Sequence, residues 1–397
     1  MTHDPAQSWV PPVRPEFADR DAYGAPQLDV AVALNVNENP FPPSAQVTAE
    51  IVAQVRATVA GLNRYPDREA RELRAALAEY VRSCLGSVEA GAIDADWIWP
   101  ANGSNEVMTH ILTAYAGPGR NMMTFPPTYS MYPEYALITH TSLLTVNRTA
   151  SFELDLPRVL AAIAEQQPDV VMLTSPNNPT GTATAPADLA TIVAASPGIV
   201  VVDEAYGEFA RTPGDSALRL LAEHRNLIVV RTMSKAFALA GVRLGYAVAH
   251  PDVVRALRVV RLPYHLSAVT QATATAALAH ADELLADVEV LRSERDVMVS
   301  WLRGQGLTAA ESDANFVLFG RFRDRQAVWR EMLARGVLIR ETGPTGWLRV
   351  SVGTPVENAA FRAALLEVIA LPESALLDSA LPESALSDVS AQMEVTT

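Results

Sequence analysis

The stretch Arg231–Tyr246 reads RTMSKAFALAGVRLGY and follows a short apolar run, Leu227–Val230. Two more apolar runs lie upstream, Val170–Leu173 and Ile199–Val202, and each is closed by polar or turn residues. Runs that are continuously apolar, rather than alternating, predict strands buried on both faces, as in a parallel sheet covered by helices. A stretch with helical potential, Pro186–Ala195, lies between two of them. The sequence therefore predicts an α/β fold with a mainly parallel central sheet.

Unusual polar groups follow all three predicted strands. The first strand leads into Ser175–Gly181 (SPNNPTG), the second into Asp203 and Tyr206, and the third into Lys235. In open α/β sheets, ligands bind beyond the carboxyl ends of the strands. We therefore expect Asn178, Asp203, Tyr206 and Lys235 to share one pocket.

This set of side chains suits pyridoxal 5'-phosphate. The aldehyde of that cofactor needs a lysine amine for a Schiff base, which Lys235 can supply. Its pyridine nitrogen must stay protonated, and a buried carboxylate such as Asp203 would hold that proton. Its phenolate oxygen needs donors, which Asn178 and Tyr206 provide. Each feature alone has an ordinary alternative, such as a surface lysine or a capping aspartate, but their order along the chain favours the cofactor site.

The cofactor phosphate needs a helix N-terminus, hydroxyl groups and a fixed cation. A helix is predicted to begin near Ser104, just after Asn102-Gly103, although such a sequence is also an ordinary helix start. The residues predicted to surround the phosphate are Gly103, Ser104, Asn105, Thr232, Ser234 and Arg243.

The chain divides into four parts on its sequence pattern. Residues 1–45 are proline-rich and predict an extended arm that joins the smaller domain. Residues 46–285 predict the large cofactor-binding domain, and 286–370 a small α+β domain. Residues 371–397 carry five acidic residues and no Lys or Arg. They predict a disordered tail, with a partner-binding segment as the alternative.

Further elements follow from helical spacing and short apolar runs. Helices are predicted from Pro66, with Asp67 as cap, from Ser104 to near Gly117, and over 270–303, 324–335 and 356–370. Strands are predicted over 315–319, 337–340 and 347–352.

Composition excludes several classes of protein. The 397 residues include 31 Lys plus Arg and 45 Asp plus Glu, so the net charge is −14. Such an acidic chain is a poor general binder of nucleic acid or anionic lipid. Cys84 is the only cysteine, and no apolar leader or membrane span is visible. These features predict a cytoplasmic soluble protein with no nucleic-acid or membrane partner and no metal site.

Ten stretches within about residues 23–370 carry a family resemblance. They are LNVNENPFPP (34–43), RYPD (64–67), NGSNE (102–106), PTYSMY (127–132), SPNNPTG (175–181), VVDEAYGEF (201–209), RTMSKAFALAGVRLGY (231–246), RLPYHLS (261–267), DANFVLF (313–319) and LRVSVGT (348–354). Through these stretches the sequence resembles the fold-type I aminotransferases. The resemblance is greatest to the histidinol-phosphate aminotransferases of actinobacteria. The stretch around Lys235 (231–246) is specific for fold-type I aminotransferases. The NENP, YPD and LRVSVGT stretches narrow the resemblance to the histidinol-phosphate branch of that family.

The resemblance implies further roles. Tyr65 would reach into a neighbouring subunit and bond the cofactor phosphate, which implies a homodimer with shared sites. Tyr129 would stack on the pyridine ring. Arg349 would bind the carboxylate of glutamate or 2-oxoglutarate, Arg340 would help to hold a substrate phosphate, and Asn39 would contact substrate. The alternative for Tyr65 and Tyr129 is a core or interface tyrosine without cofactor contact. The alternative for Arg340 and Arg349 is a surface arginine.

The resemblance also implies the reaction, in which an amino group passes between L-histidinol phosphate and 2-oxoglutarate in histidine biosynthesis. The products would be imidazole-acetol phosphate and glutamate. The alternatives are an aromatic-amino-acid aminotransferase, a related decarboxylase and a scaffold without cofactor. One residue departs from the family pattern, because Ala238 stands where many members have glycine. A positive φ there would be costly for alanine.

Overall fold

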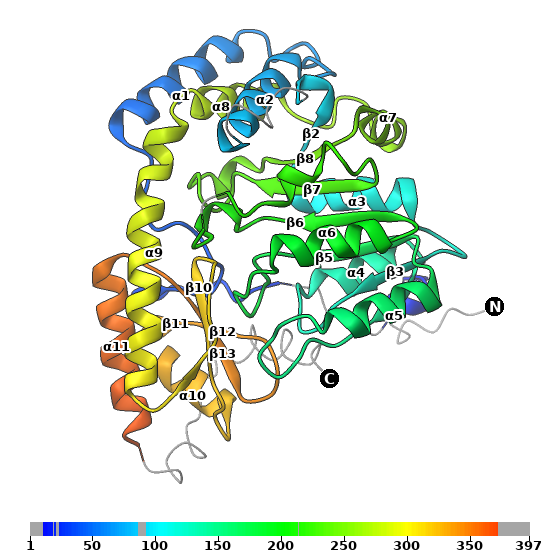
Figure 1. The fold of residues 1–397 in the computed structure, drawn as a ribbon. Helices are drawn as coiled ribbons and strands as arrows, with labels where there is room; N and C mark the ends of the chain where they lie inside the picture. The colour runs from blue at the N-terminus through cyan, green and yellow to red at the C-terminus, as the bar shows by residue number, and fades with distance from the viewer. Residues whose placement is uncertain (1–10, 19, 21–23, 86–92, 213, 372–397) are drawn as a thin grey trace, which may run out of the picture.

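The computed structural model describes residues 11–18, 20, 24–85, 93–212 and 214–371. The predicted tail, from residue 372 on, and the first ten residues of the predicted arm lie outside these ranges. A seven-stranded sheet with the order β2-β8-β7-β6-β5-β3-β4 forms the centre of the larger part (Figure 1). Its strands are β2 (Ile98–Ala101), β3 (Asn121–Thr124), β4 (Ser142–Thr145), β5 (Val170–Thr174), β6 (Ile199–Asp203), β7 (Leu227–Thr232) and β8 (Gly245–Ala249).

Most neighbouring strands of this sheet run parallel, and β8 is antiparallel to both β7 and β2. Alternate residues of each strand enter different hydrophobic cores, as the pleat requires. Val200 and Val202 of β6 pack in one core, whereas Val201 packs in the other. Both faces are therefore buried, which explains why these strands are continuously apolar in sequence.

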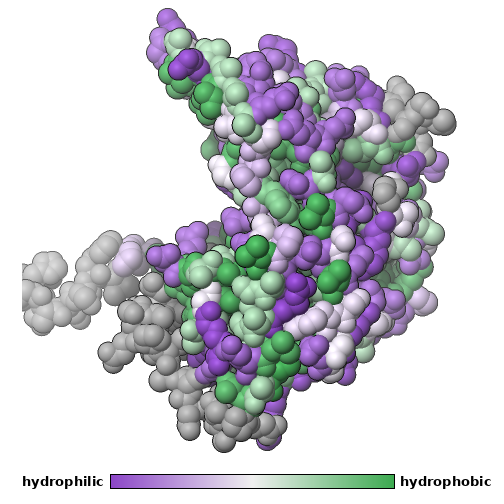
Figure 2. All heavy atoms as spheres, turned by 90° about the vertical axis from the view of Figure 1, so that its left-hand side faces the viewer, coloured by the Kyte–Doolittle hydropathy of each residue, from purple (hydrophilic) through white to green (hydrophobic). Residues whose placement is uncertain are grey.

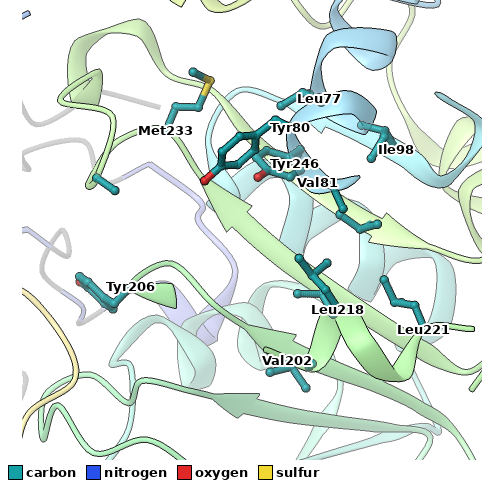
Figure 3. Close-up of a cluster of buried hydrophobic side chains, with 14 of the residues drawn as sticks. Leu77, Tyr80, Val81, Ile98, Val202, Tyr206, Leu218, Leu221, Met233 and Tyr246 are labelled. Atoms are coloured by element: carbon teal, nitrogen blue, oxygen red, sulfur yellow. The ribbon is translucent and has the colours of Figure 1, made fainter. Parts of the chain in front are cut away.

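Helices cover the two faces of the sheet. On one face lie α2 (Arg71–Leu85), α5 (Leu156–Gln166), α6 (Pro186–Ala195) and α8 (Ala268–Leu278). On the other face lie α3 (Ser104–Tyr115), α4 (Met131–Ile138) and α7 (Pro251–Val260). Figure 3 shows part of the first core, where side chains of α2, β2, β6 and β8 gather. A further helix, α1 (Ala45–Val59), packs on α8.

The helix predicted from Pro66 begins later, at Arg71. Asp67 nevertheless acts as the predicted cap, since its carboxylate accepts hydrogen bonds from the backbone N–H groups of Glu69 and Arg71, each at 3.0 Å. Residues 66–70 form the turn that this carboxylate closes, so the side chain caps the helix from outside its first turn.

The smaller part of the fold is built on an antiparallel sheet with the order β12-β13-β10-β9. Its strands are β9 (Thr308–Ala309), β10 (Phe316–Gly320), β12 (Arg340–Glu341) and β13 (Trp347–Ser351). It packs with α10 (Arg325–Ala334) and α11 (Pro355–Ile369). The N-terminal segment joins this part, because β1 (Val32–Ala33) pairs with β11 (Val337–Leu338). The 3-10 turns are η1 (Pro15–Phe17), η3 (Ala95–Trp97), η4 (Gly207–Phe209), η5 (Ala217–Leu220) and η6 (Ala240–Val242).

Helix α9 (Ala281–Gly304) connects the two parts and runs along one side of the molecule (Figure 1). Its first half contributes Leu284 and Leu291 to the large core, and its second half contributes Met298 and Leu302 to the small one. The predicted division after residue 285 falls inside this helix and stays a prediction. Within the described ranges, no helix is long and apolar enough to cross a membrane.

Candidate active site

The carboxyl ends of β5, β6 and β7 open into one cavity of about 210 Å³. These strands are adjacent and parallel, so their ends meet at the same edge of the sheet. The residues that line the cavity are Ser104, Asn105, Tyr129, Thr174, Asn178, Asp203, Ala205, Tyr206, Thr232, Ser234, Lys235 and Arg243. The structure therefore brings together most of the residues predicted to bind the cofactor.

Asp203 lies at the end of β6 with only 5% of its surface exposed. Its carboxylate accepts hydrogen bonds from the backbone N–H of Ala205 at 3.1 Å and from the hydroxyl of Tyr132 at 3.2 Å. Burial, with a smaller contribution from Glu204, raises the pKa of Asp203 to about 6. The side chain is therefore a strong acceptor for a proton on a bound ring nitrogen. Sequence reasoning missed Tyr132, which lies in α4 on the face of the sheet that α3 and α7 also cover.

Lys235 follows β7 and directs its amine into the same cavity. Its Nζ donates a hydrogen bond to the backbone oxygen of Val36 at 2.9 Å. Burial, together with the nearby charges of Arg349 and Arg243, lowers the pKa of Lys235 to about 8. A lysine amine with a pKa near neutrality is partly unprotonated at physiological pH, so it can act as a nucleophile and a base.

A cluster of hydroxyl groups, backbone N–H groups and one guanidinium lies at one end of the cavity. The Thr232 hydroxyl donates to Ser234 Oγ at 3.0 Å, and Arg243 Nη1 donates to the same oxygen at 3.4 Å. The N-terminus of α3 faces this group, with Gly103 at the N-cap. Gly103 has φ +80°, and a Cβ there would lie 2.5 Å from Arg243 Nη2. The arrangement combines a helix N-terminus with a cation and fits a phosphate group.

Asn105 completes this end of the cavity. Its side-chain oxygen accepts hydrogen bonds from Tyr135 at 2.9 Å and from Tyr129 at 3.5 Å. The second contact links Tyr129 to Asn105, and both residues line the cavity. The predicted stacking of Tyr129 on a cofactor ring stays a prediction, as does every other residue role named from the sequence.

A second cavity of about 180 Å³ adjoins the first and shares Tyr129, Asn178 and Tyr206 with it. Both predicted substrate arginines, Arg340 and Arg349, line it. The full lining comprises Ala25, Asn35, Val36, Asn37, Thr128, Tyr129, Ser130, Asn178, Pro179, Tyr206, Arg340, Thr342 and Arg349.

The two arginines are held in different ways. Arg349 is buried and donates to Asn178 Oδ1 at 2.6 Å and to the Asn35 backbone oxygen at 2.8 Å. Arg340 is half-buried and donates to the Gly24 backbone oxygen at 3.2 Å. Each guanidinium thus has a fixed direction, and the contact with Asn178 links Arg349 to a residue that lines both cavities.

Asn39 and Asn37 lie at different places beside the two cavities, and the predicted substrate contact of Asn39 stays a prediction. Asn39 donates to the backbone oxygen of Ala236, next to Lys235, and is not among the described residues that line either cavity. Asn37 lines the second cavity and donates to the Tyr206 hydroxyl at 2.9 Å. The NENP stretch therefore contributes its first asparagine to the pocket wall.

Tyr65 lies on the surface, with 79% of its area exposed. Its ring stacks on Tyr264, with the centroids 4.3 Å apart and the planes at 13°. It does not belong to the described lining of the two cavities in its own chain. This position leaves Tyr65 available to a second molecule rather than to the site of its own chain.

Ala238 has a φ of +55°, so the departure from glycine at this position is conformationally costly. It lies three residues after Lys235, and its backbone N–H donates to the Lys235 carbonyl oxygen at 3.1 Å. The loop that carries the lysine is therefore closed by a strained alanine.

The donor set fits pyridoxal phosphate. Lys235 offers an amine, Asp203 a buried carboxylate and Arg243 a cation beside hydroxyl groups, all in one cavity. Each matches a different part of that cofactor.

Comparison with known proteins agrees with this arrangement. A model of the family described as aminotransferase class I and II matches residues 30–365. The chain belongs to the class I and II aminotransferases. This aminotransferase is 57% identical to a histidinol-phosphate aminotransferase of Thermobifida fusca strain YX, over 89% of this chain and 95% of the relative. It is 55% identical to histidinol-phosphate aminotransferase 3 of Burkholderia lata, over 91% and 96% of the two chains.

A solved structure shares the fold of this aminotransferase. The histidinol-phosphate aminotransferase of Sinorhizobium meliloti, solved in complex with pyridoxal-5'-phosphate, superposes with a TM-score of 0.76 at 27% identity. The match covers 86% of this chain and 91% of that one. The predicted fold-type I aminotransferase fold and family are therefore confirmed.

Proposed function

We propose that this aminotransferase transfers an amino group from L-histidinol phosphate to 2-oxoglutarate with pyridoxal 5'-phosphate as cofactor, yielding imidazole-acetol phosphate and glutamate. The observation that carries the substrate assignment is the presence of two arginines, Arg340 and Arg349, in the cavity next to Lys235. Guanidinium groups bind phosphate and carboxylate in a bidentate manner. Two of them suit both a phosphorylated amine and a dicarboxylate. The relatives named histidinol-phosphate aminotransferase support the same choice.

The chain's own residues would perform the chemistry as follows. When bound, pyridoxal phosphate supplies an aldehyde that takes up amines and a ring that withdraws electrons. Lys235 would hold the cofactor between turnovers, and its free amine would accept the proton from the substrate α-carbon as a general base. Asp203 would keep the ring nitrogen protonated, and Asn178 and Tyr206 would donate to the ring oxygen. Thr232, Ser234, Arg243 and the loop Gly103–Asn105 would hold the phosphate.

We further propose a homodimer in the cytoplasm. The exposed side chains of Leu62, Tyr65, Leu262 and Tyr264 gather on two adjacent segments, which supports a surface for a second copy. The face in Figure 2 mixes apolar and polar side chains and is hollowed beneath the projecting upper part of the molecule. Tyr65 would cross such an interface and bond the cofactor phosphate of the partner subunit.

A substrate panel tests the assignment. We expect kcat/KM with 2-oxoglutarate to be at least ~100-fold higher for L-histidinol phosphate than for L-phenylalanine, or about 2.7 kcal/mol of discrimination. Arg340→Gln should remove most of this preference and leave phenylalanine turnover nearly unchanged. Arg321→Gln is the matched control, because Arg321 lines a neighbouring groove and lies over the Trp347 ring. Equal or better use of phenylalanine by the unmodified enzyme would instead assign it to aromatic amino acids.

A further inference from the structure

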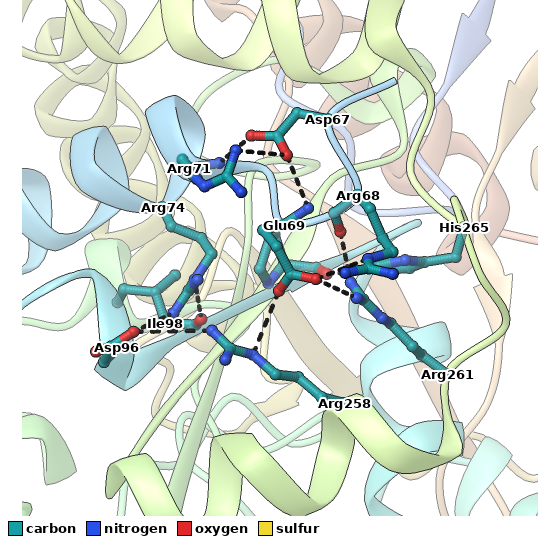
Figure 4. Close-up of polar contacts among 11 residues, drawn as sticks. Asp67, Arg68, Glu69, Arg71, Arg74, Asp96, Ile98, Arg258, Arg261 and His265 are labelled. Atoms are coloured by element: carbon teal, nitrogen blue, oxygen red, sulfur yellow. Dashed lines mark hydrogen bonds and ion pairs between the residues drawn. The ribbon is translucent and has the colours of Figure 1, made fainter. Parts of the chain in front are cut away.

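The loop that carries Tyr65 is tied to one neighbouring segment of the chain. Tyr65 stacks on Tyr264, and four residues further along Glu69 lies between Arg258 and Arg261 (Figure 4). Both arginines and Tyr264 belong to residues 258–265, at the end of α7 and in the loop after it. Two contacts of different kinds, one aromatic and one ionic, therefore connect the same two segments.

The ionic contact is short and largely buried. Arg261 Nη2 donates to Glu69 Oε1 at 2.6 Å, and Arg258 Nε lies 3.6 Å from Glu69 Oε2. The Arg261 side chain is 8% exposed and the Glu69 side chain 20%. Burial opposes ionisation of Glu69, but the hydrogen bond and charge of Arg261 hold its pKa below the ordinary value. Ion pairs with this degree of burial and direct geometry order a loop far better than exposed ones do.

Arg261 is itself held on three sides. Its Nη1 donates to the Arg68 backbone oxygen at 2.5 Å, and its guanidinium lies 5.5 Å from the centroid of the Trp99 ring. Trp99 is 2% exposed and lies in β2, so the arginine rests on the central sheet. The carboxylate of Glu69 thus attaches the Tyr65 loop to a rigid support.

The same support reaches the phosphate end of the site. His265 stacks on Trp99 with the ring planes at 9°, and its backbone oxygen accepts a hydrogen bond from Asn102 Nδ2 at 2.7 Å. Asn102 directly precedes the Gly103 loop at the N-terminus of α3. Residues 258–265 therefore contact both the segment before Gly103, near the proposed phosphate site, and the loop that carries Tyr65. In the proposed dimer, that tyrosine would act in the site of the second chain.

We propose that Glu69 is a positioning residue, which fixes the Tyr65 loop through Arg261 and Arg258 so that the Tyr65 hydroxyl meets the cofactor phosphate of a second copy of this chain. This inference rests on the proposed function. Glu69 does not contact cofactor or substrate and acts only through Tyr65. Its loss should therefore weaken cofactor binding only while Tyr65 retains its hydroxyl.

A double-mutant cycle on the cofactor-loaded dimer tests this. The equilibrium dissociation constant for pyridoxal phosphate is measured for the unmodified enzyme, Glu69→Gln, Tyr65→Phe and the double variant. We expect increases of about 3- to 10-fold for Glu69→Gln and about tenfold for Tyr65→Phe. In the Tyr65→Phe background, Glu69→Gln should add less than about twofold.

Arg71→Gln is the matched control. Arg71 lies at the start of α2 and forms an exposed ion pair with Asp67 at 3.4 Å. This variant should bind pyridoxal phosphate within about twofold of the unmodified enzyme. Thermal unfolding and the mass of the dimer, measured on each variant, separate a local effect from a loss of fold.

Two results would overturn the inference while leaving the trans role of Tyr65 intact. In the first, Tyr65→Phe binds pyridoxal phosphate more weakly while Glu69→Gln binds it as the unmodified enzyme does. In the second, the two increases in dissociation constant simply multiply in the double variant. Unchanged cofactor binding in Tyr65→Phe would instead overturn the proposed trans contact, and this inference with it. The Lys235-dependent transamination would remain testable by the substrate panel.

Discussion

Asp203 is buried at the end of β6 with a pKa raised to about 6 by that burial. The ordinary value is 3.8, so the folded chain favours the protonated acid more than the unfolded chain does. The resulting stability of the apoprotein is fully present below about pH 4 and is lost as pH rises through 6. A shift of this size corresponds to roughly 3 kcal/mol in the free energy of unfolding. The ionised Asp203 carboxylate, which suits a protonated ring nitrogen, therefore destabilises the fold of the apoprotein.

Asp203→Asn should accordingly stabilise the apoprotein above pH 7 and lower kcat. The difference in free energy of unfolding between variant and unmodified apoprotein should grow from near zero at pH 4 to roughly 3 kcal/mol at pH 8. The amide keeps an oxygen for the Ala205 N–H but cannot hold a ring proton by charge, so kcat should fall at least ~100-fold. Urea unfolding across this pH range measures the first effect. A pH-independent difference would show that Asp203 ionises normally in the fold.

At the scale of elements, the start of α3 meets the loop after β7 at close range. Gly103 has φ +80°, and an added Cβ would lie 2.5 Å from Arg243 Nη2. Gly103→Ala should therefore cost about 1–2 kcal/mol in backbone strain and push the Arg243 guanidinium out of the proposed phosphate site. We expect the dissociation constant for pyridoxal phosphate to rise at least ~10-fold, as charge-assisted contacts to the phosphate are lost.

Gly241→Ala provides the control for this prediction. Gly241 lies two residues before Arg243, has no positive φ, and has open space where a Cβ would be added. This variant should bind the cofactor as the unmodified enzyme does, within about twofold. Tight cofactor binding by Gly103→Ala, measured by equilibrium dialysis, would show that Arg243 does not serve the phosphate.

Elements with a strong local pattern were predictable, and those that depend on distant contacts were less so. The helix Pro186–Ala195 was predicted with the bounds that the structure shows, because proline marks its first turn and its inward face is apolar. Helix α1 (Ala45–Val59) was missed, since Val47 is its only fully buried residue and the proline-rich surroundings favoured an extended arm. The strand predicted over 337–340 is instead divided between two sheets, with β11 pairing to the N-terminal segment.

The active site shows the same limit on what can be predicted from the sequence. Asn178, Asp203 and Lys235 follow apolar strands directly, so strand order alone brought them together. Tyr132 donates to Asp203 from α4, a contact created by the packing of a helix on the sheet, and its partner is 71 residues away along the chain. Asn37 lines the second cavity, whereas Asn39 donates to the Ala236 backbone oxygen. A loop without periodicity does not reveal in sequence which of two asparagines faces a pocket.

Helix α9 contributes to hydrophobic cores of both parts of the molecule. Leu291 and Met298 of α9 are fully buried in different cores, two turns apart on one helix. The second cavity lies between these parts, since Asn178 comes from the large one and Arg340 from the small one. A relative movement of the two parts would therefore change the distance between cofactor and substrate contacts, while α9 keeps both cores in register.

Subunit mixing tests the proposed homodimer and its shared site. Lys235→Ala and Tyr65→Ala should each be poorly active as homodimers. In a mixed dimer, the chain with intact Lys235 receives the intact Tyr65 of the other chain, so one of the two sites is complete. Random mixing of equal amounts makes about half of the dimers mixed, and the expected activity is about one quarter of that of the unmodified enzyme.

The outcome depends on where Tyr65 acts. If Tyr65 served the site of its own chain, the chain with Lys235 would lack the tyrosine in every dimer, and mixing would restore nothing. The exposure of Tyr65, at 79%, and its stacking on Tyr264 outside both cavities favour the recovery of activity. Mixing after partial unfolding and refolding, followed by an assay with L-histidinol phosphate and 2-oxoglutarate, measures it. The control is each variant refolded separately, assayed alone, whose averaged activity gives the value expected without mixed dimers.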